Sequence, residues 1–447
     1  MKKKLVTMLL ATTMVASMFA GCGSDGGSKN SSDSGSVYML NFKPETDQAW
    51  QDLAKEYSDE KGVDVTVVTA ADGQYKTQLQ SELAKKEAPT IFNIGSTSDC
   101  AEYADYIYDL KDSEIYKHQS DKSLSLEYDG KVAAVANCYE CYGIIYNKAI
   151  LENYCKNYPD AVIKSVDDIK DLDTLEKVAT DINSNVDKIN EACGTHITEA
   201  FASAGLDDGS NWRFSGHLAG IELYYEFKDD NVTKQPETIK GTYLPEYKNI
   251  FDLYLKDSTT EPTQLSSKTG DDSTSEFSLG EAAFYQNGTW AWTDLQKAGM
   301  KADSLGMLPI YIGVKGEEKQ GLATGSENYW CINSKASDAD KKATKDFLKW
   351  VVTSKTGIKS LSSDMGFTTP FKSFSDVKSD NPLVQAAVED QNSGKTAVSW
   401  NFTMMPSEEW KNKLGSALLE YAQGTGDWNA VKKAFVDGWK TEYDAVH

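Results

Sequence analysis

The chain has 447 residues, which is enough to bury a large core, and this length favours two or more domains. Hydrophobic residues make up 40% of the sequence and aromatic residues 11%, so most of the chain is too apolar to be disordered. A formal net charge of -22 disfavours binding to nucleic acid or to anionic lipid, and no nucleic-acid partner is expected.

Arginine occurs once, at Arg213. The planar guanidinium fork that grips carboxylate and phosphate groups is therefore available at a single position. This composition disfavours amino acids, peptides and phosphate esters as ligands, although lysines or helix N-termini can replace arginine in such sites.

The N-terminal segment has the layout of a secretory signal. Three lysines precede the apolar run "LVTMLLATTMVASMFA", which is shorter than the about 20 residues that cross a bilayer. The stretch "MFAGC" resembles the bacterial lipoprotein cleavage box, with Phe19 in place of the commoner leucine. We expect a signal peptide over 1–21, a fatty-acylated Cys22 and a Gly/Ser-rich flexible tether over 22–36. The alternative is an ordinary signal peptide cut elsewhere.

From residue 37 the pattern alternates between strand and helix. "VYMLNF" and "VDVTVV" read as strands separated by a helix that carries Trp50 and Tyr57, and a polar helix then leads to a third strand, "TIFNIG". This βαβαβ unit predicts a parallel sheet covered by helices, with a ligand crevice at "NFKPE" and "NIGSTS".

Later segments predict further elements of an α/β fold. The region from 148 to 260 is expected to be mainly helical, and the polar segment from 256 to 276 is expected to be a loop. Strands are predicted in "SLGMLPIYIG" and "NYWCINSK", and a helix in "DADKKATKDFLKWVV". The last two helices are predicted around Trp410 and Trp428.

Six cysteines follow Cys22, and their pairing stays open: Cys100, Cys138, Cys141, Cys155, Cys193 and Cys331. The C-x-x-C spacing of Cys138 and Cys141 could suggest zinc or redox chemistry. On the strand that their surroundings predict, however, the two side chains face opposite sides, so we interpret them as buried residues. No metal and no cofactor are expected.

The ten tryptophans divide into two groups. Five occupy apolar helix stripes and are expected in the core: Trp50, Trp350, Trp410, Trp428 and Trp439. The other five lie in segments that mix aromatic and polar residues, as a sugar site requires: Trp212, Trp290, Trp292, Trp330 and Trp400. If "GTWAW" is extended, Trp290 faces the ligand and Trp292 faces the core.

Five stretches in order resemble the extracellular solute-binding proteins of ABC importers, in the maltose-binding-like, carbohydrate-binding group. They are "VYMLNFKPETDQAWQDLAKEYSDEKGVDVTVV", "APTIFNIG", "YECYGIIYNKAIL", "FSLGEAAFYQNGTWAW" and the segment from "LGMLPIYIG" to "DFLKWVV". The resemblance implies a type II periplasmic-binding-protein fold, in which two lobes with doubly wound, mostly parallel sheets hold the solute in a cleft. It implies an N-terminal lobe of 37–147 plus 310–353 and a C-terminal lobe of 148–309 plus 354–447. It also implies a monomer that binds a carbohydrate, delivers it to the permease subunits of an ABC transporter, and is anchored by lipid to the extracytoplasmic face of the membrane.

The resemblance also implies the site residues. Glu140 matches a carboxylate that accepts sugar hydroxyls, Trp290 matches a stacking indole, and Trp400 matches a second stacking position. At the first-lobe strand ends lie Asn41, Lys43, Glu45, Asn93 and Ser96; in the second lobe and at a crossing strand lie Trp212, Arg213, His217, Glu327 and Asn328. At His217, a hydrogen-bonded structural histidine is the favoured alternative.

Two other classes stay open. An enzyme is disfavoured because G-x-S-x-G and H-E-x-x-H motifs are missing and only four histidines are present, although a secreted glycoside hydrolase needs no such motif. A binding protein for a polyamine or peptide is compatible with the acidic charge, and Glu140 and Glu327 could bind a polyamine.

Overall fold

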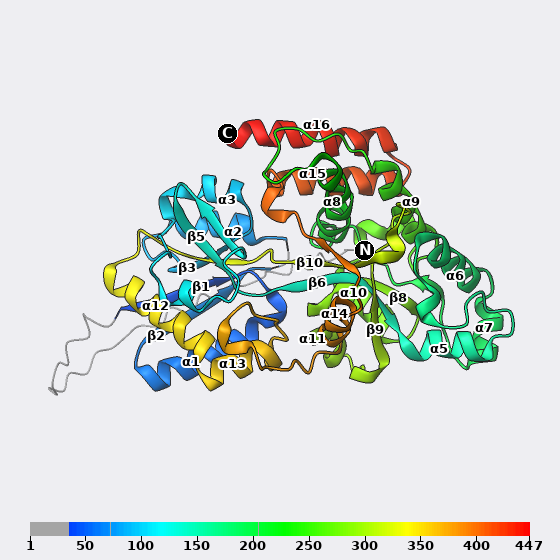
Figure 1. Cartoon of the computed structure of the whole chain (residues 1–447), viewed down its shortest axis with the longest axis horizontal. Coiled ribbons are helices and arrows are strands. Elements are labelled where there is room, and N and C mark those ends of the chain that lie inside the picture. Colours follow the sequence, from blue (N-terminus) through cyan, green and yellow to red (C-terminus); the bar gives the residue numbers. More distant parts are fainter. Residues whose placement is uncertain (1–34, 72, 204) are drawn as a thin grey trace, which may run out of the picture. The chain divides into compact units, whose positions relative to one another are not determined.

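The computed structural model describes residues 35–447 except 72 and 204, so the expected signal peptide and Cys22 lie outside the described residues. The described strands form two six-stranded sheets, with helices around both (Figure 1). This arrangement confirms the expected α/β class. Among the described helices, none combines the length and the apolar character needed to cross a bilayer.

The first sheet opens with the expected alternation of strands and helices. β1 (Ser36–Asn41) pairs in parallel with β2 (Asp64–Thr69) and with β3 (Ile91–Ile94). The connections are α1 (Asp47–Lys61) and α2 (Tyr75–Leu83). The carboxyl ends of β1 and β3 therefore lie at one edge of the sheet, where the sequence predicts the crevice.

The helix α1 forms as its hydrophobic spacing predicts. Trp50, Leu53, Ala54 and Tyr57 are all buried, so one face of the helix packs against the core. Gly62 ends the helix with a φ of 67°, a left-handed conformation that glycine adopts without strain.

The other strands of the first sheet come from later in the chain. β11 (Tyr329–Ile332) lies antiparallel between β3 and β5 (Lys131–Ala136), and β4 (Ser125–Tyr128) pairs with β5 at the edge. Trp330 on β11 is fully buried, with its ring 6.0 Å from that of Trp50. The interpretation of Trp330 as an aromatic suited to a sugar is therefore wrong, because its strand runs through the middle of the sheet.

The second sheet is built around β6 (Glu140–Asn147). This strand runs antiparallel to three others, β8 (Ala282–Gly288), β9 (Leu305–Leu308) and β10 (Gln320–Gly325). Two strands in parallel pairing complete the sheet, β7 (Glu199–Phe201) beside β8 and β12 (Thr396–Ser399) beside β10. Both sheets are thus mixed rather than mostly parallel.

The chain passes from the first sheet to the second between Ala136 and Glu140, and it returns between Gly325 and Tyr329. β6 and β10 therefore belong to the second sheet. The lobe limits expected at 147, 309 and 353 stay predictions.

The segment from 256 to 276 differs from its prediction as a loop. It contains the 3-10 helix η5 (Pro262–Ser267) and α10 (Gly270–Ser278). Thr269 and Asp272 form a reciprocal capping box that begins α10, so the polar residues interpreted as a loop are helix-start signals.

The predicted helices flank the two sheets, and α15 packs against α16 (Figure 1). Trp50, Trp350, Trp410 and Trp439 are buried as predicted, while Trp428 is half-buried. The α-helices not yet named are α3 (Thr97–Glu102), α4 (Glu114–His118), α5 (Lys148–Asn157), α6 (Leu172–Ser184), α7 (Val186–Cys193), α8 (Ala219–Asp230), α9 (Leu244–Lys256), α11 (Trp292–Lys297), α12 (Asp338–Thr353), α13 (Lys355–Lys359), α14 (Pro382–Asn392), α15 (Glu408–Ala422) and α16 (Trp428–Val446).

The six cysteines after Cys22 all carry free thiols in the structure. Cys138 and Cys141 are buried in different hydrophobic clusters, as the interpretation of their C-x-x-C spacing predicts. Within the described ranges, no group of three or more His, Cys, Asp or Glu side chains is arranged to hold a metal ion.

Candidate functional site

Residues connected to both sheets line a cavity of about 490 Å³. Its lining combines the chain after β1 and β3, the start of β6, and the segments around 212–217, 290, 327–328 and 402–411. The predicted site residues that line it are Lys43, Glu45, Asn93, Ser96, Glu140, Trp212, Arg213, His217, Trp290, Glu327 and Asn328. Their contact with a ligand stays a prediction, but the structure brings them together around one space.

The chain after β1 is held in place by Asn41. The Asn41 side chain is buried and donates a hydrogen bond of 2.8 Å to the carbonyl oxygen of Lys43, while its own carbonyl oxygen accepts from the Lys43 amide. Asn41 is not part of the cavity lining. Its contacts shape the turn that carries Lys43 and Glu45.

Lys43 forms a buried ion pair with Glu140. The Lys43 Nζ lies 3.0 Å from Glu140 Oε1 and 3.4 Å from Glu45 Oε1. Burial alone lowers the pKa of Lys43, but the Glu140 and Glu45 carboxylates outweigh this and hold it above its ordinary value. The loop after β1 thus supplies a hydrogen-bond donor to the Glu140 carboxylate.

The end of β3 presents two further predicted residues. Ser96 caps α3 with Asp99, whose carboxylate accepts hydrogen bonds from the amides of Gly95 and Ser96 at 2.8 and 3.0 Å. Burial raises the pKa of Asp99. The Tyr75 hydroxyl forms hydrogen bonds with the backbone carbonyl and amide of Asn93, and these bonds hold the Asn93 backbone in place.

Aromatic rings form one wall of the cavity. Trp290 is half-buried, and its ring centroid lies 5.9 Å from that of Trp212 and 5.4 Å from that of His217. His217 in turn stacks on Tyr142 at 4.1 Å with an interplanar angle of 10°. The Lys43 Nζ lies 5.1 Å from the Trp290 ring centroid, so a cation already touches this wall.

Trp290 and Trp292 lie in a helical turn, so the alternation of side chains along a strand does not decide which way each ring faces. β8 continues to Gly288, the 3-10 helix η6 (Thr289–Ala291) follows, and Trp292 begins α11. Asn287 and Gly288 therefore end a strand, although an Asn-Gly pair commonly forms a turn. Trp292 is buried in the core as expected, although by a different route.

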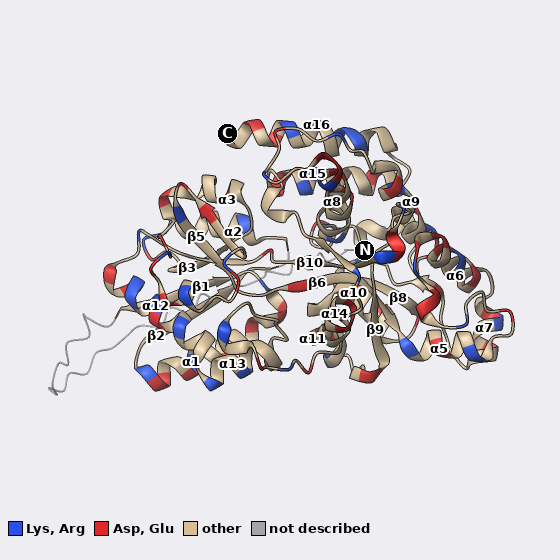
Figure 2. Ribbon diagram, viewed as in Figure 1, with Lys and Arg blue, Asp and Glu red and all other residues tan. Residues whose placement is uncertain are grey.

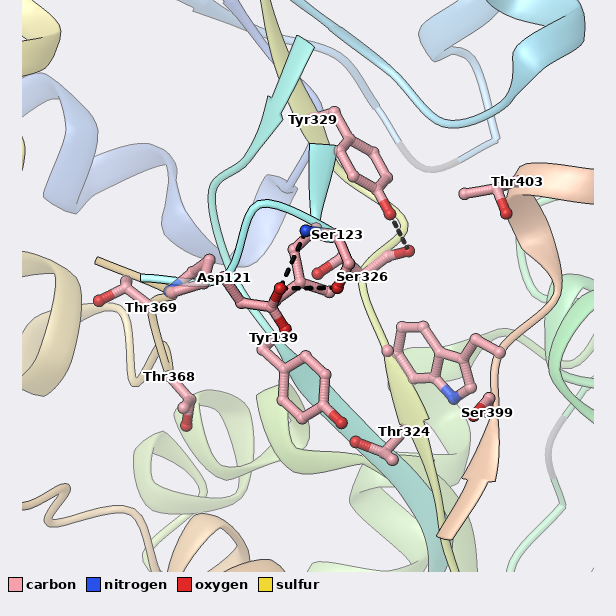
Figure 3. Close-up of a pocket in the computed structure, with 14 residues that line it drawn as sticks. Asp121, Ser123, Tyr139, Thr324, Ser326, Tyr329, Thr368, Thr369, Ser399 and Thr403 are labelled. Atoms are coloured by element: carbon pink, nitrogen blue, oxygen red, sulfur yellow. Dashed lines mark hydrogen bonds between the residues drawn. The ribbon is translucent and has the colours of Figure 1, made fainter. Parts of the chain in front are cut away.

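Trp400 contacts the aromatic wall of the first cavity and also lines a second cavity. Its ring lies 4.8 Å from His217 and 6.4 Å from Trp290, but it lines a second cavity of about 520 Å³ rather than the first. Figure 3 shows this second cavity surrounded by hydroxyl groups, with those of Tyr139 and Thr324 pointing toward each other. The predicted stacking role of Trp400 stays a prediction.

Three side chains that line the first cavity carry buried polar atoms without a hydrogen-bond partner among the described residues. They are both amide atoms of Asn93, the Nε of Arg213 and the Nδ1 of His217, and these residues are only 3%, 6% and 5% exposed. Burial, together with the positive charges of Lys411, Lys43 and Arg213, holds the pKa of His217 well below its ordinary value, so the ring is neutral. The Nδ1 atom of His217 has no hydrogen-bond partner among the described residues, and the interpretation of His217 as a hydrogen-bonded structural histidine stays a prediction. Buried polar atoms usually have a hydrogen-bond partner, so these atoms are available to a polar ligand or to water.

Sequence reasoning missed Lys411 and Phe402. Lys411 on α15 pairs with Glu408 at 2.7 Å and with Glu327 at 3.4 Å, and its Nζ lies 5.4 Å from the Phe402 ring. The helical spacing around Trp410 predicts a core stripe, but it does not indicate that the adjacent Lys411 contacts Glu327, which is distant in sequence.

Comparison with known proteins identifies the fold and the family. The solved structures that resemble the chain include the GacH receptor of Streptomyces glaucescens, described unliganded and with acarbose (17% identity, 92% of this chain and 99% of that one, TM-score 0.66). They also include a sugar transporter from Bacillus licheniformis in complex with stachyose (17%, 92% and 100%, TM-score 0.67) and maltose-bound MalE3 of T. maritima (16%, 92% and 100%, TM-score 0.65). At these identities the likeness shows a shared two-lobed α/β fold. A family model described as bacterial extracellular solute-binding protein matches residues 52–392. The chain therefore belongs to the bacterial extracellular solute-binding proteins.

Proposed function

We propose that the protein captures a saccharide, a di- or oligosaccharide, in the cavity between its two sheets and delivers it to an ABC importer without chemically changing it. The observation that carries this proposal is the pairing of an aromatic wall with buried, unpartnered polar atoms. Pyranose rings present C–H faces that pack on aromatic rings and hydroxyl groups that need donors and acceptors. Asn93 and His217 offer such groups in the cavity that Trp290 and Trp212 also line.

A polyamine ligand fits the cavity less well. Glu140 and Glu327, the carboxylates suggested from the sequence for a polyamine, already pair with Lys43 and Lys411. A polycation would have to displace both lysines from buried positions, which would leave their charges without partners.

The proposal includes a cellular setting. Cys22 carries the lipid that anchors the chain to the extracytoplasmic face of the membrane, and the Gly/Ser-rich segment between Cys22 and β1 forms the tether. Two lobes with the limits expected from the sequence close on the saccharide, and the permease recognises the closed form. The protein acts as a monomer.

A screen of mono-, di- and oligosaccharides by thermal shift and by calorimetry tests the proposal. A saccharide that binds the folded state is expected to raise the melting temperature and to be recovered unchanged. Release of shorter sugars during the incubation would contradict the binding role and support a hydrolase. A rise only with polyamines or peptides would contradict the assignment to sugars.

A further inference from the structure

The sole arginine of the chain lies in the candidate site, in a setting unlike that of any lysine there. Arg213 begins the π-helical turn η4 (Arg213–Leu218), lines the cavity and is only 6% exposed. Four lysines also line the cavity, and each has a carboxylate partner: Lys43 with Glu140 at 3.0 Å, Lys76 with Glu102 at 2.8 Å, Lys297 with Asp294 at 3.1 Å and Lys411 with Glu408 at 2.7 Å.

Arg213 has no such partner. Within the described part of the chain, no carboxylate oxygen lies within 4.0 Å of its guanidinium, and its Nε makes no hydrogen bond. The guanidinium is held instead by the Trp212 ring, whose centroid lies 4.3 Å from Cζ. A buried charge without a counterion costs folding free energy, so the arrangement calls for an anion from outside the protein.

The surroundings of the guanidinium add positive potential. A Cβ on Gly270 would lie 3.0 Å from one guanidinium nitrogen, so the group packs against the first residue of α10, where the helix dipole is positive. Asp271 in this turn is exposed and forms no ion pair with Arg213 in the described structure. Burial lowers the pKa of His217, and the positive charges of Lys411, Lys43 and Arg213 lower it further, so these three cations lie near one ring of the cavity wall.

We infer that the saccharide carries a carboxylate, as a uronic acid residue does, and that Arg213 binds this carboxylate. The inference rests on the proposed function and adds the chemical class of the ligand. A guanidinium fork matches the planar carboxylate with two parallel hydrogen bonds, and the Trp212 ring contacts the guanidinium without accepting a hydrogen bond from its Nε. Acidic and basic residues are interspersed on the helices around both sheets (Figure 2), so the net charge of -22 repels a carboxylate mainly at long range, where salt screens it, whereas the guanidinium acts in direct contact.

The test compares disaccharides that differ at one group. Calorimetry on the full chain uses a uronate disaccharide, its neutral counterpart with a hydroxymethyl group in place of the carboxylate, and a sulfated counterpart. The wild-type protein is expected to bind the uronate at least 10-fold more tightly than the neutral sugar, with a preference that shrinks as salt is added. Tighter binding of the neutral or the sulfated sugar would overturn the inference and leave the proposed saccharide function intact. Failure of all saccharides to bind would overturn the proposed function itself.

Two variants localise the effect. Arg213→Gln is expected to lose about 30-fold or more in affinity for the uronate and little for the neutral sugar, because only the first loses a charge-assisted pair. Lys55→Gln neutralises an exposed cation that does not line the cavity and is expected to leave both affinities unchanged. Equal losses for both sugars in Arg213→Gln would overturn the inference. If Arg213→Gln does not fold, the wild-type preference for the uronate decides the question alone.

Discussion

Lys43 and Glu140 form an ion pair that joins the loop after β1 in the first sheet to the first residue of β6 in the second. Both residues are buried, at 8% and 4% exposure. Removal of one partner leaves the other charge buried and uncompensated, so Lys43→Met is expected to lower the free energy of unfolding by about 3–5 kcal/mol. Urea denaturation measures this loss.

The double variant Lys43→Met/Glu140→Leu is expected to recover most of that stability, because it removes both buried charges. Lys55→Met, which breaks the exposed Lys55–Asp59 pair, is the control and should leave the unfolding midpoint unchanged. Equal losses in the single and the double variant would show that the pair does not act as a unit.

Trp290 is expected to provide most of the stacking energy for the saccharide. Trp290→Ala should weaken binding by about 5- to 150-fold, the range that corresponds to 1–3 kcal/mol per stacked ring. Trp290→Phe keeps a ring and should lose less. Calorimetry measures both, with the thermal midpoint of each unliganded variant as a check on folding. Unchanged affinity in Trp290→Ala would assign the stacking surface to another ring.

Gly288 allows the Trp290 indole to fold back over the end of β8. A Cβ at position 288 would lie 2.0 Å from the indole, so Gly288→Ala must move the ring. We expect this variant to reduce saccharide affinity and to shift tryptophan emission. Gly220→Ala adds the same methyl group where its nearest neighbour lies at 3.8 Å, and it should change neither property. Normal binding by Gly288→Ala would show that the position of the indole is not important.

Glu222 makes the stability of the fold depend on pH. Burial, with help from the nearby Glu226 charge, raises the pKa of Glu222 to about 8. Between about pH 4.3 and this value, the folded state keeps a proton that the unfolded chain has lost. The free energy of unfolding therefore falls as pH rises through this window, by up to ~1.4 kcal/mol per pH unit.

Glu222→Gln keeps an acceptor for the amide of Tyr243, which lies 3.0 Å from the carboxylate, but it cannot ionise. The variant is expected to be more stable than the wild type at pH 7, with a flatter profile in urea titrations between pH 5 and 8. Glu87→Gln changes an exposed carboxylate and serves as the control. A profile for Glu222→Gln parallel to that of the wild type would contradict the raised pKa.

Cys22 is expected to anchor the protein. Cys22→Ala should remove the acylation site and shift the protein from the membrane fraction to the medium, as fractionation and labelling with a radioactive fatty acid would show. Retention of Cys22→Ala on membranes would contradict anchoring at this residue.

The elements that could be predicted from sequence are those with local signals. The stripe of Trp50, Leu53, Ala54 and Tyr57 predicts α1, and the alternation up to β3 predicts the edge where Asn93 and Ser96 lie. The α10 helix was missed because its start depends on a side-chain capping box between Thr269 and Asp272, which resembles polar loop composition.

The site is less accessible from sequence, because its pairings join distant segments. Lys43 and Glu140 are 97 residues apart, and Glu327 and Lys411 are 84 apart, so no local pattern indicates that they meet. Trp290 lines the cavity and its contact with a ligand stays a prediction, whereas Trp330, in an equally mixed segment, lies in the core because β11 is a central strand.

The ion pairs around the cavity also constrain which substitutions this sequence can accept during evolution. A substitution of Lys43 leaves Glu140 buried without its cation, and a substitution of Lys411 leaves Glu327 without its cation. Each pair is therefore expected to change in concert in related chains. Arg213 has no such partner in the described structure, so it is free to mutate alone, and a single codon there could alter which solutes a descendant protein accepts.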